Sequence, residues 1–239
     1  MERCSMSKDT IIKALLSAEV DMTPTGFVAD ELSPDQFAAM QELFFDKIMS
    51  IHQSDLSGIA GYGEFDEDCR TRYADCRTYL TDTFAEDREG YWYNWRELFE
   101  TTVLDRSFFE HYYAEMLPLI PYCEGRRYLV YNNTFFVHMR TDGKSQIGFP
   151  DWSRSGIADG LLDFAIMDLN KPYLLIPERL HAYARQRGID IPDFRERFLC
   201  MGYYKGLDTL RWHASIDDEV SCASIMTSMR ELKGRLDAL

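Results

Sequence analysis

The fold of this chain depends on residues 128–165, YLVYNNTFFVHMRTDGKSQIGFPDWSRSGIADGLLDFA. This stretch opens with a short apolar run at Tyr128–Tyr131 and holds a second one at Phe135–Met139. Thr141-Asp142-Gly143-Lys144 is a turn signature, after which Ile147-Gly148-Phe149 resumes the apolar pattern. Short apolar runs around a turn that contains glycine are typical of paired β-strands. The stretch therefore predicts one short hairpin in the middle of the chain.

Outside this stretch the apolar residues recur at helical spacing. Ser33-Pro34-Asp35 predicts a helix start, because Ser accepts hydrogen bonds from the first turn and Pro fits its first position. The apolar positions of this helix are Phe37, Met40, Leu43, Phe44, Ile48 and Ile51. Further helices are expected near residues 11–16, over about 78–87 and 94–120, and from Asp151-Trp152 to the end, with breaks near Pro172, Gly188 and Pro192. We therefore expect a mainly α protein with a small β-hairpin, of the α+β class.

Composition excludes several classes of protein. The 239 residues are 46% hydrophobic and carry a formal net charge of −14. That charge argues against a nucleic-acid partner, because phosphate backbones require clustered Lys and Arg. No apolar run reaches the roughly 18 residues that a membrane-spanning helix needs. The six cysteines are scattered and the first residues show no apolar signal segment, so we expect a cytoplasmic protein.

Five short motifs follow one another along the chain. They are SGIAGYGEF at 57–65, WREL at 95–98, LVYNN at 129–133, DWS at 151–153 and ADGLLDFA at 158–165. In this order they resemble the glycine-rich loop, the Trp-Arg-Asp/Glu helix start, the catalytic loop, the metal-binding Asp segment and the Gly-Asp-Pro-x-Tyr-Asp segment of the aminoglycoside phosphotransferase family. Within that family the chain looks most like the hygromycin-type antibiotic kinases, and the resemblance covers roughly residues 22–239.

The resemblance implies a protein-kinase-like fold with ATP and Mg²⁺ as cofactors. In that family an amino-terminal lobe with a β-sheet and a phosphate-binding Lys precedes a hinge. Here the hinge-like segment Met22–Phe27 follows only residues 1–21, which contain no strand pair and no Gly-rich loop. We therefore expect residues 1–21 to form a helix that replaces or precedes the lost lobe, and residues 22–239 to form the carboxy-terminal lobe alone.

The residues of the catalytic loop can be compared with the kinase template His-x-Asp-x-x-x-x-Asn. Aligned without a gap, Tyr131 stands at the His, Asn133 at the catalytic Asp and His138 at the metal-binding Asn. Asp151, the second metal ligand, is retained. An amide cannot accept the proton of the acceptor hydroxyl, so Asn133 predicts a loss of general-base catalysis. The resemblance thus makes Tyr131, Asn133, His138 and Asp151 the candidate site, and no residue is assigned to the nucleotide.

Several of these residues have two interpretations. His138 and Asp151 could form an acid–base pair or a metal site, or His138 could be a structural residue of a strand. Tyr131 and Asn132 could contact a ligand or satisfy backbone groups of the loop. The aromatic residues at 91–95 could stack on a ligand or pack in the core. The acids at 64–68 could face a cationic substrate or belong to a solvated loop, whereas Asp159 and Asp163 are expected to be structural.

Three functions of different classes remain open. The first is a degenerate phosphotransferase-like protein that binds a small cationic or sugar-like ligand, or a protein partner, without transferring phosphate. The second is an enzyme with altered acid–base or metal chemistry at Tyr131, His138 and Asp151. The third is an active ATP-dependent phosphotransferase. Loss of the amino-terminal lobe would leave an open surface, so a homodimer is a further possibility.

Overall fold

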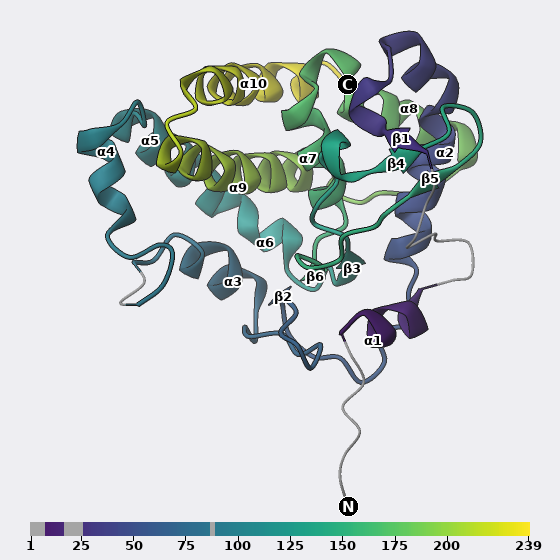
Figure 1. Cartoon of the computed structure of the whole chain (residues 1–239), viewed down its shortest axis with the longest axis horizontal. Coiled ribbons are helices and arrows are strands. Elements are labelled where there is room, and N and C mark those ends of the chain that lie inside the picture. Colours follow the sequence, from purple (N-terminus) through teal and green to yellow (C-terminus); the bar gives the residue numbers. More distant parts are fainter. Residues whose placement is uncertain (1–7, 17–25, 87–88) are drawn as a thin grey trace, which may run out of the picture.

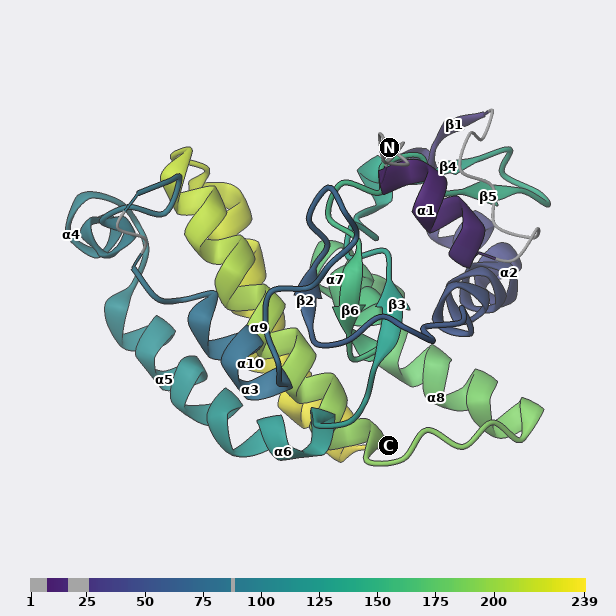
Figure 2. The ribbon, with the colours of Figure 1, turned by 90° about the horizontal axis from the view of Figure 1, so that it is seen from below.

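A buried helix forms the centre of the computed structural model, which describes residues 8–16, 26–86 and 89–239. This helix, α9 (Phe194–Ser215), is buried without a break from Arg197 to Arg211. It contacts α5 (Arg106–Met116), α7 (Leu161–Asn170) and α10 (Glu219–Asp237), and Figures 1 and 2 show these helices around it. The chain is therefore mainly helical, as the sequence predicts.

The predicted helix after Ser33 is confirmed as α2 (Pro34–His52). The Ser33 side chain accepts a hydrogen bond from the Gln36 backbone, and the Gln36 side chain accepts one from the Ser33 backbone. Pro34 occupies the first turn, where its missing N–H costs nothing. The expected apolar face is buried at Phe37, Met40, Phe44, Ile48 and Ile51, and Leu43 is partly buried.

The described residues also form two antiparallel three-stranded sheets. The first has the order β1 (Phe27–Val28), β4 (Arg140–Thr141) and β5 (Ile147–Gly148). The second has the order β2 (Gly63–Glu64), β6 (Gly156–Ala158) and β3 (Tyr128–Val130). The predicted hairpin is thus confirmed at β4–β5. Its turn is held by Asp142, whose side chain accepts backbone N–H groups of Lys144, Ser145 and Gln146.

The structure corrects the expected strand before this hairpin and the expected helix after it, because β6 occupies Gly156–Ala158 and α7 begins only at Leu161. The apolar run at Phe135–Met139 is not a strand but contains a 3₁₀ turn, η4 (Phe136–His138). A distant partner explains the difference, because the Asn170 side chain accepts the backbone N–H of Phe136. The sequence did not predict β6. Gly156 is required there, since a Cβ would lie 2.2 Å from the backbone oxygen of Gly63.

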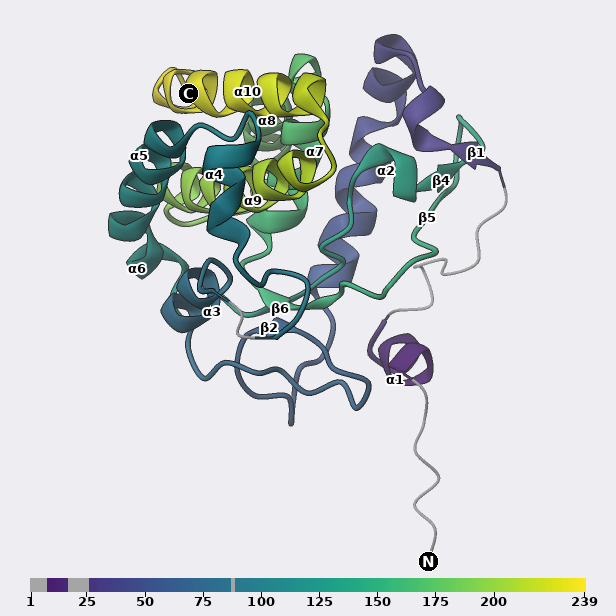
Figure 3. The same ribbon diagram turned by 60° about the vertical axis from the view of Figure 1, so that its left-hand side comes forward.

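The expected continuous helix over 94–120 is wrong. The segment is divided into η2 (Trp95–Glu97), α4 (Leu98–Thr101), α5 and η3 (Leu117–Leu119). The backbone is extended at Thr102, and Asp105 then caps α5 by accepting the Phe108 N–H at 3.0 Å. The break turns α4 away from α5 and towards the end of α9, as Figure 3 shows.

The remaining elements complete the chain. They are α1 (Lys8–Leu15), η1 (Ala29–Glu31), α3 (Cys76–Asp82), α6 (Ile120–Cys123), η5 (Pro172–Leu174) and α8 (Ile176–Arg187). The expected first helix is present as α1, whose Lys8 donates to the carbonyl oxygens of Phe65 and Ser153. Most of the hinge-like segment Met22–Phe27 lies outside the described residues. In the described part, no helix has the length and apolar character needed to cross a membrane.

Candidate functional site

A buried carboxylate holds the loop that follows β3. Asp163, on α7, accepts the backbone N–H groups of Tyr131 at 3.1 Å and Asn132 at 2.7 Å. The ring of His52 lies 3.0 Å from the same carboxylate. These contacts support the left-handed backbone of Asn132, whose φ of 52° is uncommon for a residue other than glycine. Asp163 therefore has the structural role expected of it, and it fixes the direction of the candidate catalytic loop.

Asp159, the residue that follows β6, also stabilises this region. Its carboxylate pairs with both Nε and Nη2 of Arg197, at 2.7 and 2.9 Å, in a buried ion pair. One of its oxygens also accepts the Leu161 N–H at the start of α7. Asp159 thus binds the first backbone N–H of α7, although Gly160 is the N-cap residue, and the bidentate pair fastens α9 to the loop before α7.

Asn133 and Asp151, two positions of the catalytic template, lie side by side. The Asn133 side-chain amide donates to Asp151 at 3.1 Å between Nδ2 and Oδ2. Partial burial acts to raise the pKa of Asp151, but hydrogen bonds from Ser153, the nearby His138 and the Asn133 amide lower it overall. Asp151 is therefore an exposed carboxylate that stays ionised at neutral pH.

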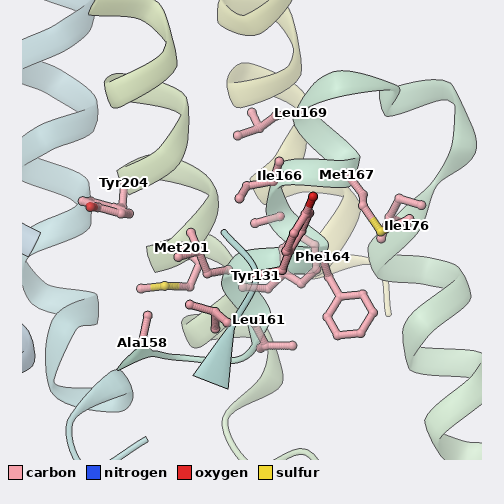
Figure 4. Close-up of a cluster of buried hydrophobic side chains, with 14 of the residues drawn as sticks. Tyr131, Ala158, Leu161, Phe164, Ile166, Met167, Leu169, Ile176, Met201 and Tyr204 are labelled. Atoms are coloured by element: carbon pink, nitrogen blue, oxygen red, sulfur yellow. The ribbon is translucent and has the colours of Figure 1, made fainter. Parts of the chain in front are cut away.

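Tyr131 has a different environment from Asp151. Figure 4 shows its ring within the buried apolar cluster that includes Phe164 and Met167. Its hydroxyl accepts the backbone N–H of Asp151 at 3.1 Å. Burial is the main reason that the pKa of Tyr131 is raised well above its usual range. Tyr131 thus positions the Asp151 backbone, and it does not line the cleft described below.

His138 is exposed at the end of η4, and it lines the same cleft as Asn133 and Asp151. In the described parts of the chain, no hydrogen bond or ion pair joins His138 to Asp151. Nor do these parts contain a group of three or more His, Cys, Asp or Glu side chains that could hold a metal ion. His138 and Asp151 therefore line the same cleft, without a third His, Cys, Asp or Glu among the described residues to complete a metal site with them.

The cleft has a volume of about 440 Å³. It lies between the candidate catalytic loop, the carboxy-terminal half of α9 and the start of α10. Its apolar wall comprises Phe135, Val137, Leu169, Trp212 and Ile225. Its uncharged polar groups, besides Asn133, come from Asn170, Thr209, Ser221 and Ser224. An apolar wall with a few converging polar groups is typical of small-molecule sites.

Sequence reasoning missed the charged floor of this cleft. Lys205 and Asp208 are buried on α9 and form an ion pair at 3.2 Å, and Lys205 also reaches Asn132 Oδ1 at 3.5 Å. Burial and the neighbouring Arg154 lower the pKa of Lys205. The segment GYYKG at 202–206 indeed lies in a helix, but the lysine within it faces the site. The available signal was a lone lysine on an otherwise apolar helical stretch.

The acidic and aromatic segments have divided roles. Glu64 pairs with Arg154 at 2.8 Å and accepts the Asn132 side chain at 3.1 Å, so it belongs to the loop support. Asp66 accepts backbone N–H groups of its own turn. Trp95 is buried in the core, whereas Tyr91 and Tyr93 are exposed. Trp92 lies under the guanidinium of Arg211, at 3.7 Å from the ring centre, so here the aromatic ring does contact a cation.

No protein-family model matches the chain, and no curated protein sequence matches it. Solved structures do match. Aminoglycoside phosphotransferase APH(4)-Ia superposes with a TM-score of 0.74, over 94% of this chain and 80% of that one, at 16% identity. The chain has the aminoglycoside phosphotransferase fold. This finding confirms the predicted kinase-like architecture.

Two further structures show the same fold with ligands bound. A thermostable mutant of APH(4)-Ia, in a ternary complex with AMP-PNP and hygromycin B, matches with a TM-score of 0.72 and 17% identity, over 95% of this chain and 81% of that one. Another thermostable mutant, in a ternary complex with ADP and hygromycin B, matches with a TM-score of 0.74 and 16% identity over the same shares. At these identities the likeness establishes the fold, and the chemistry of this chain must come from its own residues.

Proposed function

We propose that this chain is a binding protein built on the phosphotransferase fold. It takes a small sugar-like or cationic molecule in the cleft beside Asn133 and Asp151, and it does not transfer phosphate at a useful rate. The observation that carries the proposal is the hydrogen bond from the Asn133 amide to Asp151. Where the template has a proton acceptor, this loop has a donor, and that donor is directed at the remaining carboxylate.

The loss of the general base has a predictable size. General-base assistance contributes about 10²–10⁴-fold in rate, which is about 3–5.5 kcal/mol of barrier. His138 compounds the loss, because an imidazole replaces the template amide beside Asp151. ATP and Mg²⁺ would be expected from the fold family. Asp151 could be one carboxylate ligand of Mg²⁺, but His138 stands where the template has its metal-binding Asn, and Mg²⁺ prefers oxygen ligands to an imidazole nitrogen. Asp151 and His138 therefore do not fit the Asp–Asn pair of the template.

The composition of the cleft supports a sugar-like ligand. Trp212 is 44% exposed and forms part of the apolar wall, which suits the apolar face of a sugar ring. The Ser, Thr and Asn side chains that converge on the same space can exchange hydrogen bonds with hydroxyl groups. The ionised Asp151 would accept a hydroxyl or ammonium group. The division of the chain into residues 1–21 and residues 22–239 remains part of the proposal.

Calorimetric titration with hygromycin B, glucose, adenosine, spermidine and ATP–Mg²⁺ tests this function. We expect at least one sugar or amine to bind, and no turnover of ATP with any of them. Trp212→Ala should weaken that binding about tenfold or more, whereas Tyr173→Ala, an exposed aromatic residue outside the cleft, should leave it unchanged. Absence of binding across the panel at millimolar concentrations, or ATP-dependent modification of an acceptor, would contradict the proposal.

An enzyme with altered chemistry is the second candidate. It is favoured by one observation, that His138 and Asp151 are both exposed and both line the cleft. If the pair performs acid–base or metal-assisted work, His138→Ala should abolish turnover, or the purified protein should contain a stoichiometric metal. A protein without metal whose properties do not respond to His138→Ala excludes this candidate. A homodimer remains a separate prediction, which light scattering of the purified chain would decide.

A further inference from the structure

Two cationic side chains that line the cleft have no role in the proposed function. Arg154, in the loop after Asp151, and Lys205, on α9, both line the 440 Å³ cleft. Both approach one oxygen, Asp208 Oδ2, at 3.9 Å from Arg154 and 3.2 Å from Lys205. Two like charges are thus brought to the same small area. An anion at this place would be attracted by both.

The carboxylate that pairs with Lys205 also pairs with another cation. The other oxygen of Asp208 accepts from Arg211 at 3.1 Å, so Asp208 is shared between two helix neighbours. The Lys205 side chain is only 3% exposed, and the described hydrogen bonds use two of the three N–H donors of its ammonium. A buried ammonium is costly unless it is paired and fully hydrogen-bonded. An anionic ligand group in the cleft would complete its set of partners.

Arg154 also has a donor available. Its Nε and Nη2 atoms both donate to a single oxygen of Glu64, at 3.1 and 2.8 Å. No hydrogen bond among the described residues uses its Nη1 atom. The side chain is 47% exposed, so a ligand can reach it. Arginine with a donor edge open to solvent suits phosphate and carboxylate groups.

A second cleft opens on the same floor. This cleft has a volume of about 270 Å³ and is lined by Arg154 and Asp208 together with Tyr73, Tyr79 and Trp92 among others. Arg154 thus lies at the junction of the two clefts. An anionic group held there could extend into either of them while the body of the ligand remains against Trp212.

We propose that Arg154 and Lys205 form an anion-binding subsite, so that the ligand of this cleft is a sugar-like molecule carrying a phosphate or carboxylate group. This inference rests on the proposed function, since it names the class of ligand for the same cleft. It also sets the ligand apart from a purely cationic one. The anionic group would bind at Arg154 and Lys205, and hydroxyl or ammonium groups would lie towards Asp151.

Calorimetric titration with glucose, glucose 6-phosphate, glucuronate and inorganic phosphate tests the subsite. The two sugar anions should bind at least about tenfold more tightly than glucose, because charge-assisted hydrogen bonds exceed neutral ones. Their advantage should shrink as NaCl is raised from about 50 to about 300 mM, since salt screens exposed charges. A difference between glucose 6-phosphate and glucuronate would show which anion the subsite prefers.

Two variants that should change the affinity for sugar anions in opposite directions make the test specific. Arg154→Gln should remove most of the advantage of the sugar anions. Glu64→Gln should increase it several-fold, because it removes the carboxylate that competes for Arg154 while keeping an acceptor for Asn132. Arg106→Gln is the matched control: its side chain is also 47% exposed and pairs with Glu100 at 2.8 Å, and it should change nothing. Circular dichroism would confirm that each variant folds.

The outcomes separate the two proposals. If glucose binds as tightly as glucose 6-phosphate, or if Arg154→Gln has no effect on either sugar anion, the anion subsite is wrong and the sugar-binding function survives. If Glu64→Gln weakens the sugar anions, the subsite is also wrong. If none of the sugars, anions or amines binds, both proposals fail.

Discussion

The loop after β3 has a buried side and an exposed side, and the two differ in how closely they keep the phosphotransferase pattern. On the buried side, Asp163 holds the loop backbone and Asp159 pairs with Arg197. On the exposed side, which borders the cleft, the buried Asn133 and the exposed His138 differ from the residues of the kinase template with which the sequence aligns them. The comparison teaches that the residues supporting the loop keep the pattern more closely than those that face the cleft. The following predictions test that comparison.

The largest effect is expected on the buried side at Asp159. Asp159→Ala leaves Arg197 as an unpaired charge; the two side chains are 0% and 3% exposed in the native pair. Breaking such a pair costs about 3–5 kcal/mol in the free energy of unfolding. Asp237→Ala, which removes the exposed partner of Arg195, should cost less than about 1 kcal/mol. Urea denaturation of both variants checks the contrast, and equal losses would contradict it.

A loss of similar size is expected at Asp163. Asp163→Ala leaves the backbone N–H groups of Tyr131 and Asn132 buried without partners. Each of the two unsatisfied groups costs about 1–3 kcal/mol, so we expect a loss of about 2–6 kcal/mol in the free energy of unfolding. Asp151→Ala, on the exposed side, should stay within about 0.5 kcal/mol of the parent. If Asp151→Ala proved the more destabilising in urea denaturation, the division into a supporting side and a chemical side would be wrong.

Asn133→Asp restores the carboxylate of the template, and it should make the stability of the protein depend more strongly on pH. Asn133→Asp places a second carboxylate about 3 Å from Asp151, and two such groups cannot both ionise without cost. The folded-state pKa of one of them is then raised above its unfolded value of about 4. The resulting loss, about 1 kcal/mol, should therefore be absent near pH 3.5 and grow as the pH rises to about 7. Equal stability changes at both pH values would show that the two side chains do not interact.

The smallest expected effect concerns Asp151 in the parent chain. Its folded-state pKa is lowered, so its contribution to stability is present above the unfolded value of about 4 and disappears as the pH falls through the folded value. Because the carboxylate is exposed, we expect less than about 0.5 kcal/mol. Asp151→Asn should reduce the loss of stability between about pH 6 and pH 2.5 by that amount. A steeper pH dependence in the variant would have the wrong sign.

Local signals explain which elements could be predicted. The α2 helix carries its own capping box and a regular apolar face, so its position follows from adjacent residues. The hairpin β4–β5 follows from the Asp142 turn. The run at 135–139 could not be assigned in this way, because its conformation depends on Asn170, 34 residues away from Phe136. The break before α5 had a local signal in Asp105, which caps α5. The long apolar pattern over residues 94–120 led to one continuous helix being predicted instead.

The candidate site divides in the same manner. Asn133, His138 and Asp151, which the motif order made candidates, line one cleft, and the structural roles of Asp159 and Asp163 were anticipated. Tyr131 proved to be a core residue, because an apolar run does not reveal which of its members faces inward. Lys205 and Trp212 were missed, since only the packing of α9 brings them to a loop that lies far earlier in the chain.

The unbroken burial of α9 has a consequence for how a ligand is received. One end of this helix is fastened by the Arg197–Asp159 pair, and about two to three turns later it presents Lys205 and Asp208 to the cleft. Because α9 is buried and held in this way, its backbone cannot move aside or change the shape of the cleft when a ligand binds. Recognition should therefore proceed as lock and key, with bound and unbound backbones nearly superimposable. Association should then be limited by diffusional encounter and orientation rather than by a slow opening step.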